Sequence, residues 1–271
     1  INPANFDPFL PFGTFSVVGA GAIVFFAYIG FDAVSTAAEE TKNPGRDLPI
    51  GIIGSLVIST LLYIAVTLVL TGITPWQTFA GSPNAAAAAF NAAGLNQAGL
   101  LIAIGGIVGI TGVLLTNQLG MPRILMGMAR DGLLPGRLAR VHPSFGTPAF
   151  VTVVGSLIMA ILAGVTPLAA AVNLVNIGTL FAFVVASIAV MVLRRKMPNA
   201  KRPFKVPGAP WSLFLGIFLM LLLSIGLGTI TMIRFVAWTG IGLIVYGFYG
   251  GPRSKLAARS RGGRRVVLEP K

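Results

Sequence analysis

Seven stretches of about twenty apolar residues limit what this chain can fold into. About twenty residues of α-helix, rising 1.5 Å per residue, cross the hydrocarbon core of a bilayer. Hydrophobic residues make up 55% of the chain and charged residues only 10%, whereas about a quarter of the residues in a soluble domain are charged. The sequence therefore predicts an all-α membrane protein with seven transmembrane helices. They are expected at residues 15–37, 50–72, 100–122, 147–165, 170–193, 211–230 and 232–250.

The basic residues fall almost entirely on one side of these segments. Of the 20 Lys and Arg, only Arg234, near the start of segment 232–250, falls on the opposite side. Cytoplasmic connections of membrane proteins carry such an excess. The N-terminus is therefore expected outside the cell membrane and the C-terminus in the cytoplasm. Residues 1–250 would form a multi-pass membrane domain and residues 251–271 a basic cytoplasmic tail, either solvated or in contact with anionic lipid headgroups.

The same distribution explains the formal net charge of +13 by topology, so it gives little support to nucleic-acid binding. The chain starts at Ile1, without a Met or a signal peptide. An N-terminus outside the membrane requires a way of getting there. We therefore expect these residues to belong to a longer chain, with an odd number of spans before Ile1.

One acidic residue, Asp32, lies inside the first apolar segment. It precedes Thr41 by nine residues, which is roughly 13 Å along a helix. A carboxylate at this depth is costly unless it is neutralised, paired or reached by water. Asp32 is expected to respond to protons or cations, or to orient a cation or a lysine in a site. The alternative is a structural role, in which it bonds a neighbouring helix and stabilises packing.

Gly30 interrupts the same segment among bulky residues, Tyr28, Ile29 and Phe31. Glycine lowers helix propensity by about 1 kcal/mol relative to alanine. A break at this position would expose backbone carbonyls that can accept hydrogen bonds from an ammonium group. Secondary transporters place their sites at discontinuous helices of this kind. The sequence therefore predicts a transport site at residues 28–32.

A second polar set lies in the third segment and contains Thr111, Thr116 and Asn117. These side chains could line the site, or they could make interhelical hydrogen bonds worth about 1 kcal/mol each. The residue pattern leaves both interpretations open.

Other functional classes find less support. The chain has no cysteine and a single histidine, His142 in a polar loop, so no metal or cofactor is predicted. Beside Asp32, the spans hold no second carboxylate, His or Cys with which to build an enzyme. A seven-helix receptor or retinal protein, or a channel-like protein, is the alternative. However, segment 232–250 has no lysine for a retinal Schiff base, and no ring of acidic residues or repeated filter motif appears.

Three stretches, residues 25–52, 121–148 and 194–210, together resemble bacterial amino acid permeases. They read FFAYIGFDAVSTAAEETKNPGRDLPIGI, MPRILMGMARDGLLPGRLARVHPSFGTP and RRKMPNAKRPFKVPGAP. The resemblance is to the cationic amino acid transporter group of the amino acid–polyamine–organocation superfamily, and it covers essentially the whole chain. That family has twelve spans, the first ten built as two inverted five-helix repeats. The resemblance implies that this chain holds spans six to twelve, which are the second repeat plus two C-terminal helices.

The resemblance also implies roles for individual residues. Segment 15–37 would be the broken first helix of the second repeat, and residues 26–30 would surround the substrate. Carbonyls and side chains around Phe26, Ala27 and Ile29 would contact the substrate's amino group and side chain, with Phe26 as an aromatic gate. Thr116 would lie near the substrate side chain. Asp32 would belong to the adjoining polar network, which we expect to include Thr111.

The implied activity is secondary active transport of amino acids by alternating access, coupled to protons. The family's carboxylate-binding glycine loop and its coupling lysine would lie in spans that precede Ile1. Whether the substrate is neutral, cationic or a polyamine stays open.

Overall fold

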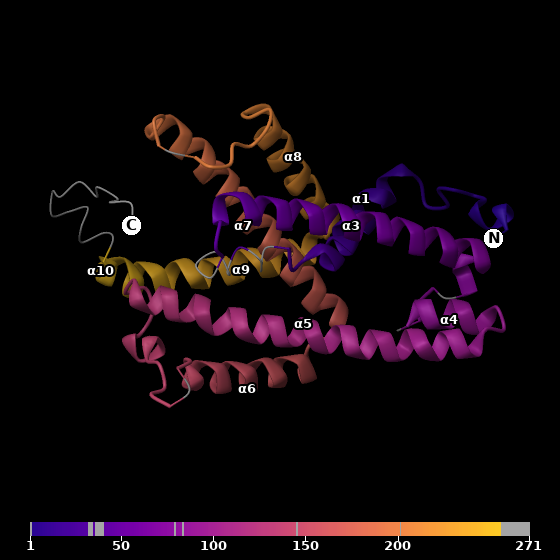
Figure 1. Cartoon of the computed structure of the whole chain (residues 1–271), viewed down its shortest axis with the longest axis horizontal. Coiled ribbons are helices and arrows are strands. Elements are labelled where there is room, and N and C mark those ends of the chain that lie inside the picture. The colour runs from indigo at the N-terminus through magenta and orange to yellow at the C-terminus, as the bar shows by residue number, and fades with distance from the viewer. Residues whose placement is uncertain are drawn as a thin grey trace. The chain divides into compact units, whose positions relative to one another are not determined.

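The computed structural model describes residues 2–31, 35, 41–78, 80–82, 84–144, 146–200 and 202–255, and every regular element in these ranges is a helix (Figure 1). Four helical runs are long and apolar enough to cross a membrane. They are α3 (Pro44–Ile73), α5 (Asn96–Arg130), α7 (Leu168–Lys196) and Thr229–Arg253, which begins with α9 (Thr229–Val245). The other three predicted spans are shorter apolar helices, Thr14–Tyr28, α6 (Ala149–Val165) and α8 (Trp211–Gly226).

The chain forms two compact units, whose boundaries fall inside α5, inside α7 and between α8 and α9. The first comprises residues 1–116 and 183–226, and the second comprises residues 117–182 and 227–271. In the first unit, α1 (Thr14–Val24) packs against α8. A Cβ atom on Gly226 would lie 3.0 Å from the Val18 carbonyl oxygen and 3.3 Å from Ala22 Cβ. Glycine at this crossing therefore lets the two helix backbones approach closely.

The N-terminal segment and the connection to α5 both form hydrogen bonds with residues at the C-terminal end of α3. The backbone N–H of Asn2 and the side-chain amide of Asn5 both donate to the Gly72 carbonyl, at 2.8 and 3.1 Å. The Thr74 hydroxyl donates to the Ala89 carbonyl of α4 (Ala85–Ala92) at 3.1 Å. The connection between α3 and α5, residues 74–95, thus contains a 3-10 turn at Trp76–Thr78 and the helix α4.

Helix boundaries differ from the predicted segments at several points, for example at the start of α3, which begins at Pro44 instead of residue 50. Helix α5 continues through Pro122 to Arg130, beyond the predicted end at residue 122. Helices α8 and α9 are joined at Leu227 and Gly228, a few residues before the expected turn near 231. Gly228 has a φ of 83°, a left-handed conformation that glycine adopts readily. Hydropathy alone could not locate this turn, because apolar residues continue on both sides of it.

In the second unit, α6 runs beside the C-terminal half of α5 (Figure 1). The Ser156 hydroxyl lies 3.1 Å from Gln118 Oε1, and Gly155 leaves room for the Met121 side chain. Near the end of the described chain, the backbone N–H of Lys255 donates to the Asp131 carbonyl at 3.1 Å. Residues 256–271, most of the predicted tail, lie outside the described residues.

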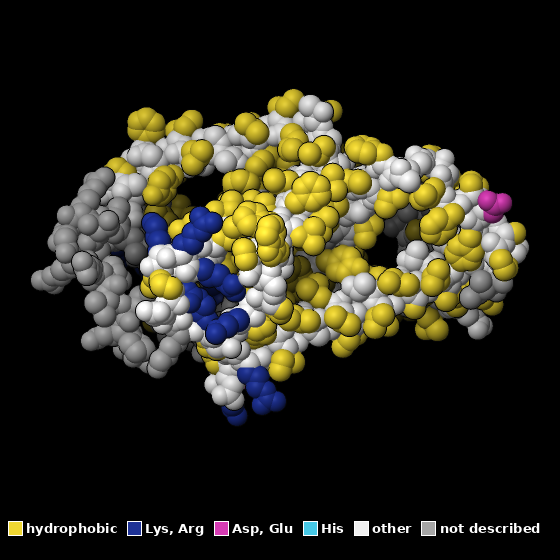
Figure 2. Space-filling view, turned by 90° about the horizontal axis from the view of Figure 1, so that it is seen from above, with side chains coloured by type: hydrophobic (Ala, Val, Ile, Leu, Met, Phe, Trp, Pro, Cys, Tyr) yellow, Lys and Arg dark blue, Asp and Glu magenta, His cyan; other side chains and the backbone are white. Residues whose placement is uncertain are grey.

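The helices expose most of their large apolar side chains. Figure 2 shows a face covered mainly by hydrophobic side chains, on which the visible Lys and Arg gather in one region. Soluble monomers rarely expose contiguous apolar patches above a few hundred Å². Lipid or further transmembrane helices must therefore cover this surface, as expected for a multi-pass membrane protein.

Candidate functional site

The first apolar segment is interrupted where the sequence predicts a break. Helix α1 ends at Val24 and continues as a 3-10 helix over Phe25–Tyr28. Ile29 is then extended, with φ −65° and ψ 130°, and Gly30 has a φ of 128°. Only glycine takes such a φ without strain. The backbone conformation at residue 30 therefore requires glycine. Asp32 lies outside the described residues.

A cavity of about 330 Å³ adjoins this interruption. The broken segment supplies one wall with residues 27–31, and Val113 of α5 also lines the cavity. The opposite wall is one face of α3, made of Ser55, Leu56, Ser59 and Tyr63. Backbone that leaves the helical pattern at membrane depth is tolerated where it lines such a cavity.

Tyr63 joins the two walls. Its hydroxyl donates a hydrogen bond of 2.8 Å to the Ala27 carbonyl, and its ring meets the edge of Tyr28 at a centroid distance of 5.2 Å. Where a helix ends, its last carbonyls need partners from outside the helix. Tyr63 provides one such donor and fixes the direction of a carbonyl beside the cavity.

An aromatic residue of α7 supports the interruption as well. The ring of Phe183 contacts Phe25, before the break, at 6.5 Å and Phe31, after it, at 5.4 Å between centroids. Aromatic pairs at such distances add about 0.5–1.5 kcal/mol beyond their buried area. The broken segment is therefore held by packing from α7 and by a hydrogen bond from α3.

The structure brings four of the predicted site residues together and leaves three elsewhere. Residues 27–30 line the cavity. Phe26 is 44% exposed and outside the lining, and its carbonyl accepts the Ile29 N–H at 3.2 Å. Thr111 and Thr116 each donate to a carbonyl of their own helix, Ile107 at 2.8 Å and Gly112 at 3.0 Å. Neither threonine is among the described lining residues.

Sequence reasoning missed the α3 wall. Ser55, Ser59 and Tyr63 recur every four residues inside the predicted span 50–72. Residues four apart lie on the same face of a helix, so this polar stripe was a usable signal. What it could not show is that the stripe faces the interruption.

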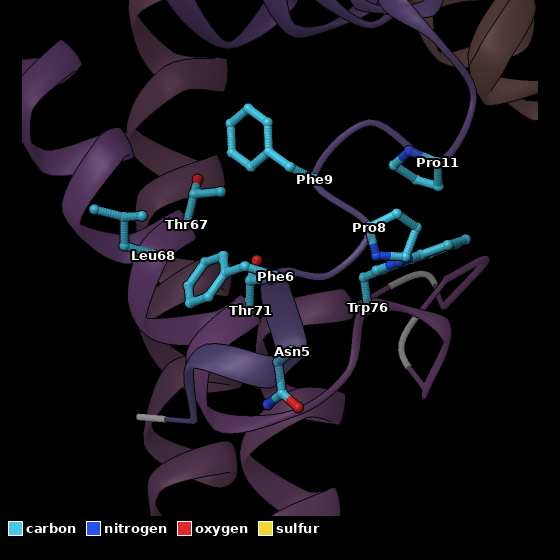
Figure 3. Close-up of a pocket in the computed structure, with 9 residues that line it drawn as sticks. All are labelled: Asn5, Phe6, Pro8, Phe9, Pro11, Thr67, Leu68, Thr71 and Trp76. Atoms are coloured by element: carbon cyan, nitrogen blue, oxygen red, sulfur yellow. The ribbon is translucent and has the colours of Figure 1, made fainter.

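A second cavity, of about 270 Å³, lies where the N-terminal segment crosses the end of α3 (Figure 3). Its walls are mainly apolar, formed largely by Phe6, Phe9 and Leu68, with Pro8 drawn beside Trp76. The Asn5 amide points away from the cavity centre, in keeping with its bond to Gly72. This cavity does not adjoin a break within an apolar segment, so the cavity at Gly30 is the better candidate site.

Apolar helices with an interruption beside a cavity are the architecture of membrane transport proteins. The chain belongs to the amino acid permease family, whose model matches residues 1–249. It is 46% identical over 94% of its length to the branched-chain amino acid permease BcaP of Bacillus subtilis strain 168, and 44% identical over 94% to the methylthioribose transporter of the same organism. It is also 41% identical, over 70% of its length, to cationic amino acid transporter 1 of Arabidopsis thaliana.

The chain spans only part of these relatives, 55% of each Bacillus protein and 32% of the Arabidopsis protein. All three are named as permeases or transporters, which agrees with the expectation that the chain is not an enzyme.

Proposed function

We propose that this chain forms part of a secondary active transporter that moves amino acids across the cell membrane by alternating access. The observation that carries the proposal is the interruption at Gly30 beside the cavity walled by α3. The names of two similar proteins, a branched-chain amino acid permease and a cationic amino acid transporter, support the substrate class.

The interruption would bind the amino group of the substrate. An ammonium group has three donors and no acceptor, so it requires acceptors such as the carbonyls of Ala27 and Ile29, two residues that line the cavity. Carbonyl dipoles act more strongly in a cavity of low dielectric than in water. Tyr63 would keep the Ala27 carbonyl pointed in one direction, through its 2.8 Å bond. The substrate side chain would lie against the α3 wall.

Alternating access follows from the same geometry in this proposal. A chain that leaves the helical pattern at Ile29 and Gly30 can change direction there, because a few residues can absorb a large change in φ and ψ. We further propose that transport is coupled to protons, with Asp32 in the polar network next to the site. Asp32→Asn keeps the size of the side chain and removes its charge, so uptake should lose part of its pH dependence.

The complete permease that contains these residues should be reconstituted in proteoliposomes and tested with labelled amino acids, with and without an imposed proton gradient. Saturable uptake above that of empty vesicles, increased by the gradient, is expected. Gly30→Leu should reach the membrane and lose most of this uptake. Absence of any amino acid uptake by the correctly folded wild type would overturn the proposed function.

A further inference from the structure

We propose that the face of α3 formed by Ser55, Leu56 and Ser59 selects substrates with neutral side chains, and that Ser59 is a specificity-determining residue. This inference rests on the proposed function of the cavity as the substrate site. It concerns a wall that the sequence did not single out.

The chemistry of the wall motivates the substrate class. Among the described lining residues, the side chains are aliphatic, aromatic or hydroxylic, and none carries a charge. A buried cation is costly unless an anion is paired with it. Ser55, Leu56 and Ser59 supply no such partner to a lysine or arginine side chain, whereas an aliphatic side chain would contact Leu56. The amino group that all amino acid substrates share is also charged, but the backbone carbonyls of the interruption can accept its hydrogen bonds.

Ser59 is the residue of this wall at which a substitution should change the cavity most directly. It lies one turn from Ser55 on the same face of α3, and it is half-buried, whereas Ser55 is exposed. The Ser55 hydroxyl donates to the carbonyl of Ile52 in its own helix at 2.9 Å. Ser59 is also one turn from Tyr63, which bonds Ala27. A group introduced at residue 59 would therefore enter the cavity close to the interruption.

Substrate competition in proteoliposomes of the complete permease tests the inference. Uptake of labelled leucine by the wild type should be inhibited by unlabelled leucine or valine at concentrations about tenfold or more below those needed of lysine or arginine. Ser59→Asp places a carboxylate in the cavity and should strengthen inhibition by lysine about tenfold. Ser59→Asn, nearly the same size but neutral, is the matched control and should leave lysine a poor competitor.

A labelling experiment tests the position of residue 59 without requiring a change of substrate. Ser59→Cys and Ile58→Cys are compared on a background without other cysteines. Ile58 lies at nearly the same depth, is 61% exposed and is absent from the lining. Saturating leucine should slow modification of Ser59→Cys by a methanethiosulfonate reagent several-fold and leave Ile58→Cys unaffected.

The outcomes separate this inference from the proposed function. A wild type that transports no amino acid contradicts the proposed function itself. A wild type that accepts lysine or arginine as well as leucine leaves amino acid transport standing and overturns the neutral class. If inhibition by lysine is unchanged in Ser59→Asp, or if leucine protects the two cysteine variants equally, Ser59 does not determine substrate specificity.

Discussion

The Tyr63 hydroxyl donates a 2.8 Å hydrogen bond to the Ala27 carbonyl, so α3 holds the last turn before the interruption at Gly30. Tyr63→Phe removes this donor and keeps the ring against Tyr28. A hydrogen bond of this kind contributes about 0.5–1.5 kcal/mol. The half-saturation concentration for uptake should therefore rise roughly 2- to 10-fold, with less change in maximal rate. Tyr246→Phe, at an exposed tyrosine outside the cavity lining, is the control, and equal values for both variants would contradict the role of Tyr63.

Gly30 and Gly105 provide a matched pair for the backbone of the interruption. A Cβ atom added at either position meets nothing within 4 Å, and only Gly30 has a positive φ, 128°. Gly30→Ala should destabilise the protein by about 1–3 kcal/mol through backbone strain, while Gly105→Ala should be neutral or stabilising in helix α5. Thermal unfolding in detergent measures the difference. Equal melting temperatures would mean that residue 30 does not need glycine.

Arg202 closes the C-terminal end of α7. Its guanidinium donates to the carbonyls of four residues at distances of 2.6–3.4 Å: Leu193, Met197, Pro198 and Ala200. A lysine ammonium cannot span four acceptors as a planar guanidinium does. Arg202→Lys should therefore cost about 1–2 kcal/mol of stability, read from the melting temperature. Arg195→Lys, exposed in the last turn of the same helix, should cost nearly nothing. A similar loss in both variants would contradict the capping role.

The membrane orientation proposed from the positive charges can be tested by cysteine substitution and labelling at two alanines. Ala92 in α4 and Ala200 in the loop after α7 are both exposed. In the complete permease on a cysteine-free background, a membrane-impermeant maleimide applied to intact cells should label Ala92→Cys and not Ala200→Cys. Permeabilised cells, in which both should react, provide the control. The reverse pattern would place the N-terminus in the cytoplasm.

The sequence by itself determined the all-helical membrane architecture and the break in its first segment. A run of about twenty apolar residues is stable as a helix in lipid because every backbone polar group is then satisfied within the segment. This argument needs no knowledge of neighbours, and four of the seven predicted runs are helices of membrane length. The break at Gly30 was also a local inference, from a flexible residue among bulky ones, and its φ of 128° agrees with it.

Only the tertiary structure decided which polar side chains lie at the cavity. Thr111 and Thr116 were candidates as polar residues inside an apolar segment, yet both hydroxyls bond carbonyls of their own helix, an arrangement that satisfies them without a neighbour. In the sequence, Ser55, Ser59 and Tyr63 look like any other polar stripe on a helix. The structure shows that they line the cavity beside the interruption. Hydropathy gives the depth of a residue in the membrane, whereas the rotation of a helix about its axis depends on contacts between segments far apart in the chain.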